Sequence, residues 1–412
     1  MNIQNTRVHP TQVYYDAIGA DGTAPPTLPR NAPSRMASAR KIEAYLSEDA
    51  GLRTRYARAK ALRRVARYSN NYDITSRCNL FCEGCFYFEG DDYKRAKEEH
   101  DLPKWRSLFE AEAQRGVTFA NFLGAEPSLE QKRIALALAY IGRGVIFTNG
   151  TVKIDPAIKY TIQISVWGDE EATKTLRGGS VLHKALRTYR DDPRAGALFT
   201  VNAKNIDQIS AVTRIVADYG IKLSYNYFSP TDKYLQKLAQ NAPNDEECFR
   251  LSSPDDNLIL TPDALERVRD RIDDMIDIYP DVVIHSHAFN QVATNPEGIY
   301  DIDPQTKIAR NCSAKHSAWH QTHRVDLGLS DGKCCTPNTN CRHCRLSSTS
   351  LSSIMFRLED FLDSRDDFVG WLDICDQWAH SHLLDTDVIF ASEDVSEGVV
   401  AADYAARHCA IG

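Results

Sequence analysis

The sequence predicts an α/β protein whose parallel strands form an open, partial (β/α)6 barrel. From residue 70 to residue 228, short runs of β-forming residues alternate with longer runs of helical periodicity. This alternation implies parallel strands that are joined by right-handed crossovers. Six such units in about 160 residues form a sheet that does not close on itself.

Each expected strand and helix corresponds to a run of residues with the matching hydrophobic pattern. The strands are residues 71–76, 119–124, 144–148, 161–167, 197–202 and 222–228. The helices between them are residues 103–115, 128–141, 179–190 and 205–219, and only the connection 149–160 is short. In sheets of this kind, ligands collect at the carboxyl ends of the strands. The first cysteine group and the motifs after later strands fall at such ends.

The flanking segments are expected to be helical or irregular. Residues 1–35 are rich in Pro, Gly, Ala and Asn and predict an arm with little regular structure. Residues 36–68 predict one or two helices, and Thr261-Pro262 begins a helix that reaches Tyr279. Residues 281–287 predict another strand. Residues 350–412 are expected to be mostly helical, with Trp371 and Trp378 packing against the rest.

Composition restricts the class of protein. The chain has 412 residues, 42% hydrophobic and 25% charged, as expected for a globular protein. It has no apolar run long enough to span a membrane, and its first residues lack the apolar core of a signal peptide. We therefore expect a cytoplasmic protein. The net charge of −7 argues against nucleic-acid partners, which attract positive surfaces.

The eleven cysteines are unusual for such a chain. In a reducing compartment they do not form disulfides, and reduced cysteines that cluster suggest a metal site. Three lie within residues 78–85 and five within residues 312–344. Only Cys248, Cys375 and Cys409 stand alone.

The first group, Cys78, Cys82 and Cys85, has the spacing C-x3-C-x2-C directly after the first expected strand. Three thiolates on one short loop can bind three irons of a cubane cluster and leave the fourth iron open to a small molecule. The alternative is a zinc site, which needs a fourth ligand, and residues 70–100 offer only His100.

The loop CNLFCEGC resembles the cluster-binding signature of the radical S-adenosylmethionine (SAM) superfamily, and the resemblance covers about residues 70–230. It implies a [4Fe-4S] cluster that binds SAM through its open iron. The chain departs from the family at Gly84, where an aromatic or apolar residue is common. Phe86 and Tyr87 follow and would supply the surface beside the adenine.

Further motifs match the family in order. Gly124-Ala125-Glu126-Pro127 resembles its GGEP motif, and Glu126 would accept a hydrogen bond from the SAM ammonium. Thr148-Asn149-Gly150 ends the third strand as in many members, although a plain turn has the same residues. The resemblance also implies SAM contacts by Ser165, Arg177 and Asn202, whose alternatives are caps, turns and surface charge.

The second cysteine group resembles the auxiliary-cluster region of the SPASM and twitch branches. The full SPASM run is absent, so one auxiliary [4Fe-4S] cluster of the twitch type fits better. The expected ligands are Cys312, one of the pair Cys334 and Cys335, Cys341 and Cys344. The alternative is a structural zinc site.

The resemblance implies reductive cleavage of SAM to a 5′-deoxyadenosyl radical, which abstracts hydrogen from a small-molecule or carrier-bound substrate. Net oxidation or rearrangement, helped by the auxiliary cluster, is the main expectation. Alternatives are modification of a ribosomal peptide and epimerisation with a cysteine hydrogen donor. Another class of function is a non-enzymatic zinc-binding scaffold.

Candidate catalytic groups are few. Cys335 and Cys375 are spare thiols among the possible hydrogen donors, and His285 or His287 could accept a proton if their strand faces the pocket. An electron donor such as flavodoxin or ferredoxin is expected as a partner. The basic stretch from Arg53 to Arg67 is a dock for an acidic partner or a solvated helix face.

These features give a linear domain plan of five segments. It comprises an N-terminal arm and helices (1–69), the partial barrel (70–235), a barrel extension and connector (236–311), the auxiliary-cluster module (312–346) and a C-terminal helical segment (347–412).

Overall fold

The computed structural model describes residues 32–47, 49–88, 97–241, 253–330, 334 and 339–384. The chain divides into two compact units, residues 1–50 and residues 51–412. In the first unit the described residues form α2 (Ala32–Ser47), which begins inside the arm expected at 1–35. The segment boundaries expected at residues 69, 235, 311 and 346 stay predictions.

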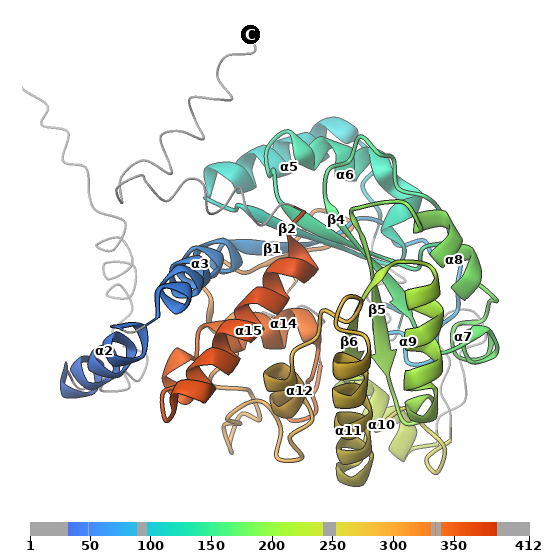
Figure 1. Cartoon of the computed structure of the whole chain (residues 1–412). Helices are drawn as coiled ribbons and strands as arrows, with labels where there is room; N and C mark the ends of the chain where they lie inside the picture. Colours follow the sequence, from blue (N-terminus) through green and yellow to red (C-terminus); the bar gives the residue numbers. More distant parts are fainter. Residues whose placement is uncertain are drawn as a thin grey trace, which may run out of the picture. The chain divides into compact units, whose positions relative to one another are not determined.

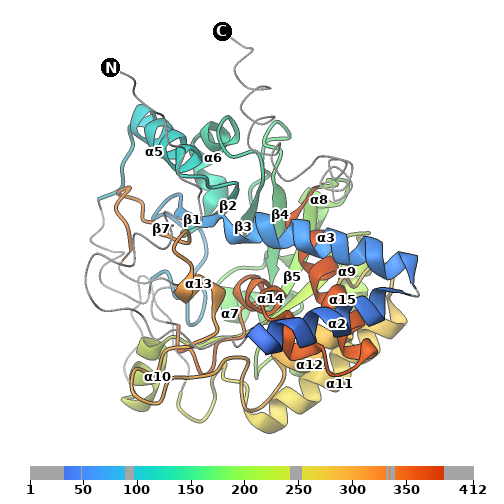
Figure 2. The ribbon, with the colours of Figure 1, turned by 90° about the vertical axis from the view of Figure 1, so that its left-hand side faces the viewer.

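The second unit contains a seven-stranded sheet in the order β6-β5-β4-β3-β2-β1-β7, in which every pair of neighbours is parallel (Figure 1). The strands are β1 (Ser69–Asp73), β2 (Phe119–Leu123), β3 (Gly144–Thr148), β4 (Thr161–Val166), β5 (Ala195–Val201), β6 (Lys222–Tyr227) and β7 (Thr322–His323). The expected parallel α/β class is confirmed. The two-residue β7 lies beside β1 (Figure 2) and is too short for a sequence pattern.

The helices of this unit connect and cover the strands. They are α3 (Ala50–Arg67), α5 (Leu102–Gln114), α6 (Gln131–Leu138), α7 (Glu170–Arg177), α8 (Leu182–Tyr189), α9 (Ile209–Asp218), α10 (Asp232–Ala239), α11 (Pro262–Ile278), α12 (His287–Ala293), α13 (Ser313–His316), α14 (Ser347–Met355) and α15 (Arg365–His382). Short 3-10 turns are η1 (Pro127–Glu130), η2 (Ile206–Gln208) and η3 (Leu358–Phe361). The helix expected at 179–190 is α8, whereas α7 was not predicted.

The strand register divides the sheet into two unlike faces. The outer face carries large apolar side chains, such as Tyr72, Phe122 and Ile146, which pack with Trp105 and Phe109 of α5. Helices α5, α6, α8 and α9 lie on this side (Figure 1). Burial of these side chains is the main source of stability for the sheet, at roughly 25 cal/mol per Å² of apolar surface.

The inner face lies on the other side and is covered by α14 and α15 (Figure 1). The side-chain amide of Gln163 on β4 donates to the carbonyl of Ser381 in α15, at 2.7 Å. Trp371 and Trp378 of α15 are buried, which confirms the expected packing of these two residues. None of the helices in the described residues is long and apolar enough to cross a bilayer.

The strand expected at residues 281–287 does not form. Only Val283 forms a bridge, parallel to Leu223 of β6, and His287 is already the first residue of α12. Ser286 caps this helix by accepting a hydrogen bond from the backbone of Phe289. The run DVVIHSH is therefore divided by a helix cap, which turns His287 out of the extended chain.

Candidate active site

The first cysteine group lies on the loop that follows β1. Strand β1 ends three residues before the expected end at residue 76: Ile74 still donates to the Leu123 carbonyl at 3.0 Å, while Thr75 and Ser76 donate to Glu98. Its carboxylate accepts hydrogen bonds from the Ser76 backbone at 2.9 Å and from the Ser76 hydroxyl at 2.7 Å. Arg133, which is buried, pairs with Glu98 at 2.6 Å and donates to the carbonyl of Ile74 at 2.5 Å. This network fixes the start of the cysteine loop.

The far side of the loop is attached to the end of α7. The backbone N–H groups of Phe81 and Glu83 donate to the carbonyls of Arg177 and Leu176, at 3.0 and 2.7 Å. Gly84 has a φ of +58°, and a Cβ there would lie 2.9 Å from the Tyr234 ring. Glycine is required here by conformation and by space.

The three thiols lie close enough for their charges to interact. Burial raises the pKa of Cys85 to about 12, and the charge of Cys82 adds to the rise. Burial also raises the pKa of Cys78 to about 11, and Cys82 again contributes. Three thiolates in this loop would therefore repel one another without a bound cation.

Each of these sulfurs also accepts an N–H hydrogen bond. The Leu80 amide lies 3.4 Å from the Cys78 sulfur, and the Arg177 Nε lies 3.5 Å from the Cys82 sulfur. The backbone amides of Phe88 and Tyr87 donate to Cys85 and act against the rise in its pKa. Such donors stabilise metal-bound thiolates.

No three or more His, Cys, Asp or Glu side chains converge to hold a single metal ion within the part of the chain that is described. The ligands of one ion must converge on one point, whereas the thiolates of a cubane cluster each bind a different iron. The ligand set Cys78, Cys82 and Cys85 stays a prediction.

The motif after β2 packs against the start of the cysteine loop. Gly124 has a φ of +113°, and a Cβ there would lie 2.9 Å from backbone atoms of Ile74 and Thr75. The next two amides, of Ala125 and Glu126, donate to the carbonyls of Thr75 and Arg77, both at 2.9 Å. Any larger residue than glycine would separate these two segments.

Glu126 is almost completely buried and joins the ends of β2 and β3. Its carboxylate accepts from the Thr148 hydroxyl at 2.6 Å, the Asn149 amide at 2.7 Å and the Ser128 amide at 3.0 Å. A carboxylate has about four acceptor positions, so one is left for a ligand. The predicted contact of Glu126 with SAM stays a prediction.

Asn79, which the sequence analysis did not single out, links the cysteine loop to the turn after β3. Its side-chain oxygen accepts from Asn149 at 2.8 Å, and its amide donates to Thr151 at 2.8 Å. The sequence feature that could have identified Asn79 is its position as a polar residue between two cysteines of the motif.

Arg177 joins the end of β4 to the cysteine loop. Its Nη1 donates to the carbonyl of Ser165 at 2.5 Å, and its guanidinium lies over the Trp167 ring at 6.0 Å. Ser165 and Arg177, two predicted SAM contacts, are thus neighbours. Trp167 was not among the predicted site residues.

Asn202 follows β5 and is completely buried. Its side-chain oxygen accepts from the Lys204 amide at 3.0 Å, whereas its side-chain Nδ2 is buried without a hydrogen-bond partner. Such a donor needs a partner, because an unpaired buried polar group costs free energy. Phe86, another predicted contact, is 37% exposed.

The second cysteine group is also brought together. Burial, followed by the charges of Cys334, Cys312 and Cys341, raises the pKa of Cys344 well above its usual range. Cys335 lies outside the described residues. Four of the five candidate auxiliary ligands are therefore neighbours, and the auxiliary cluster itself stays a prediction.

The segment that carries these thiols contacts both edges of the sheet. The Thr322 hydroxyl on β7 donates to the carbonyl of Cys334 at 3.1 Å. At the other edge, the amide of Arg345 donates to the Ser229 hydroxyl at 2.8 Å, just after β6. The second cysteine group therefore lies across the opening of the sheet.

The candidate catalytic histidines have structural partners. His285 is 3% exposed, and its nitrogens contact the Tyr227 hydroxyl at 2.9 Å and the Gln377 amide at 3.0 Å. Burial lowers the pKa of His285 to about 3, so the ring is neutral. His287 is exposed and contacts Asp273 at 2.8 Å, so the two rings do not share a strand face.

Cys375 lies on α15 in a buried position. Burial and then the charge of Asp376 raise the pKa of its thiol, while Arg63 and Arg55 of α3 oppose the rise. Its charged neighbours therefore belong to α3 and α15 and not to either group of clustered cysteines.

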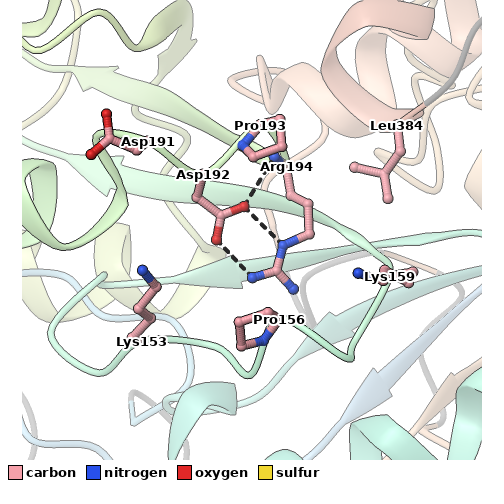
Figure 3. Close-up of a pocket in the computed structure, with 8 residues that line it drawn as sticks. All are labelled: Lys153, Pro156, Lys159, Asp191, Asp192, Pro193, Arg194 and Leu384. Atoms are coloured by element: carbon pink, nitrogen blue, oxygen red, sulfur yellow. Dashed lines mark hydrogen bonds and ion pairs between the residues drawn. The ribbon is translucent and has the colours of Figure 1, made fainter.

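A pocket of about 400 Å³ opens on the amino-terminal side of β4 and β5 (Figure 3). It is lined by Lys153, Pro156, Lys159, Asp191, Asp192, Pro193, Arg194 and Leu384. The Arg194 guanidinium is already paired with Asp192 at 2.7 Å (Figure 3). None of the predicted site residues lines this pocket. The pocket lies at the amino-terminal ends of the strands, whereas the cysteine loop follows the carboxyl end of β1.

No protein-family model matches the chain, and no curated protein matches it. The solved structures that are similar to this chain include two that are described as native anSMEcpe with bound AdoMet and Cp18Cys peptide and native anSMEcpe with bound AdoMet. Both are 14% identical, with TM-scores of 0.44 and 0.45. They cover 69% and 68% of this chain and 83% and 79% of theirs. Sequence identities and TM-scores this low assign neither a family nor a ligand to this chain.

Proposed function

We propose that this protein is a radical SAM enzyme in which Cys78, Cys82 and Cys85 hold a [4Fe-4S] cluster. The observation that most strongly supports this proposal is that three interacting thiols share one loop at the carboxyl ends of the parallel strands. Each of the three sulfurs accepts a hydrogen bond from an N–H group. When bound, the cluster and SAM supply a 5′-deoxyadenosyl radical that abstracts a hydrogen atom.

The surrounding residues support a SAM site. The buried and unpartnered Nδ2 of Asn202 is a donor that lacks an acceptor, and Glu126 has one acceptor position left. Arg177 presents a positive charge beside Cys82. Together they provide a donor, an acceptor and a cation for a ligand that carries a carboxylate, an ammonium and hydroxyl groups.

The second cysteine group supports an auxiliary [4Fe-4S] cluster held by Cys312, Cys334, Cys341 and Cys344. Its place across the opening of the sheet suits an electron acceptor for the substrate, and hence net oxidation or rearrangement of a small-molecule or carrier-bound substrate. The electron that starts the reaction comes from a partner such as flavodoxin or ferredoxin.

The test is anaerobic reconstitution followed by iron analysis and dithionite-driven cleavage of SAM. We expect about eight irons per chain, as for two cubane clusters, and formation of 5′-deoxyadenosine. Cys82→Ala should lose about four irons and all SAM cleavage, because the first cluster then lacks a ligand. Cys375→Ala is the matched control, since it removes a buried thiol outside both groups.

Two outcomes would contradict the proposal. Colourless protein that binds only zinc would support the scaffold, and continued 5′-deoxyadenosine formation by Cys82→Ala would show that the loop does not carry the cluster.

A further inference from the structure

The inner face of the sheet carries a polar side chain on five of the six strands from β1 to β6. The register places these residues on one face, since paired residues of parallel strands point to the same side. They are Asn71, Asp73, Asn121, Gln163, Ser165, Thr200, Ser224 and Asn226. Parallel strands covered on both faces normally carry apolar runs, so this polar face needs an explanation.

Helices α14 and α15 cover part of this face. Gln163 on β4 donates to the Ser381 carbonyl of α15 at 2.7 Å, and the Ser347 amide at the start of α14 donates to the Asn226 side-chain oxygen at 2.8 Å. Asn121, Ser165 and Asn226 keep part of their surface accessible. These two helices therefore do not close the inner face completely.

Asp73 is the acidic residue of this face and the last residue of β1. It is 5% exposed, and its Oδ2 is buried without a hydrogen-bond partner. None of the ion pairs among the described residues includes Asp73, and the nearby Arg324 pairs with Asp326 at 3.1 Å. Burial raises the pKa of Asp73 to about 7, and the charge of Arg324 only opposes this rise.

Strand β1, which carries Asp73, is connected to both cysteine groups. Cys78 begins the first group five residues later in the sequence. On the same face of β1, the Asn71 amide donates to the Thr322 hydroxyl at 3.2 Å, and Thr322 donates to the carbonyl of Cys334 at 3.1 Å. A molecule that reaches Asp73 would therefore be placed near both groups.

We propose that the Asp73 carboxylate binds the substrate, and that it recognises a primary ammonium group. This inference rests on the proposed function, because it assumes that the substrate of that reaction binds on the inner face of the sheet, beside the two cysteine groups. A buried carboxylate is stabilised best by a cationic donor, since the hydrogen bond is then charge-assisted. Asn121, whose side chain is partly exposed, would supply a neutral contact for the rest of the molecule.

The test uses methylammonium chloride as the probe and the thermal midpoint of the purified full chain as the readout. At about pH 8 the carboxylate is ionised, and a ligand that binds only the native state raises the midpoint. We expect methylammonium to raise the midpoint of the wild type above that in sodium chloride of equal ionic strength. Asp73→Asn should lose this difference, because the shape is kept and the charge is removed.

Asp101→Asn is the matched control, since Asp101 is an exposed aspartate whose side chain does not cap α5. It should keep the full methylammonium shift. An equal shift in Asp73→Asn, or no shift in the wild type, would overturn the proposal. Iron analysis of the same samples separates this outcome from failure of the proposed function, which would show as protein without clusters.

Discussion

The Nε of Arg177 lies 3.5 Å from the sulfur of Cys82, while the backbone carbonyl of Arg177 accepts a hydrogen bond from Phe81 at 3.0 Å. One residue at the end of α7 therefore holds both the backbone and a thiol of the cysteine loop. Its guanidinium is buried and also bonded to the carbonyl of Ser165, so it cannot move away without losing these contacts. The loop and α7 form one structural unit.

Replacing this cation should change the redox behaviour of the first cluster. Arg177→Gln removes a positive charge and an N–H donor beside Cys82, and both favour the reduced, more negative cluster. We expect a more negative midpoint potential in a redox titration followed by electron paramagnetic resonance. Lys174→Gln, an exposed change on the same helix, should leave the potential unaltered. An unchanged potential in an Arg177→Gln protein with full iron content would exclude this role.

Gly84→Ala should destabilise the cysteine loop. The new Cβ would lie 2.9 Å from the Tyr234 ring, at a φ of +58°. We expect a loss of roughly 1–3 kcal/mol in urea unfolding and reduced iron content. Gly220→Ala is the control, because Gly220 has a φ of +67° but nothing within 4 Å. Gly220→Ala should lose only the stability that the strained backbone costs. An equal loss of stability in both variants would show that the contact with Tyr234 is unimportant.

Asp73 should make stability depend on pH. Folding raises the pKa of this carboxyl from 3.8 to about 7, through burial opposed by Arg324. A raised pKa means that its contribution to stability is complete below about pH 4 and is lost as the pH rises through 7. Relative to Asp73→Asn, the wild type should therefore lose up to about 4 kcal/mol between these limits. Parallel pH profiles of the two proteins would contradict the buried, unpaired position.

Glu126→Gln should weaken the connection between β2 and β3. The carboxylate accepts three hydrogen bonds, and an amide would place its NH2 group against either the Asn149 N–H or the Ser128 N–H, depending on its orientation. We expect about 1–3 kcal/mol less stability in urea unfolding and weaker SAM binding by calorimetry. Glu171→Gln, an exposed change, is the control. Unaltered stability and SAM binding would show that these contacts are dispensable.

Most of the sheet could be predicted from local patterns. Strand β3 was predicted without error, and β4 and β6 each to within one residue, because an apolar residue occupies at least every second position of their runs and turn residues bound them. The end of β1 was wrong by three residues: Thr75 and Ser76 donate to Glu98, a contact that no local pattern shows. The strand at 281–287 failed because a Ser286 cap begins α12.

The site was predictable only in part for the same reason. The spacing of Cys78, Cys82 and Cys85 was visible in the sequence, as was the glycine motif after β2. The role of Asp73 could not be predicted, because an aspartate at the end of a strand is common. Only the structure shows that it is buried and that its Oδ2 has no hydrogen-bond partner.

By itself, the sequence determined the parallel α/β architecture and the residue types that can hold iron, because hydrophobic period and cysteine spacing are local properties of the chain. Only the tertiary structure decided which of these residues meet. It brought Cys312, Cys334, Cys341 and Cys344 together, placed Arg177 beside Cys82 and withdrew His285 into the core. Contacts between residues far apart in sequence depend on how helices and strands pack, and packing is set by the whole chain at once.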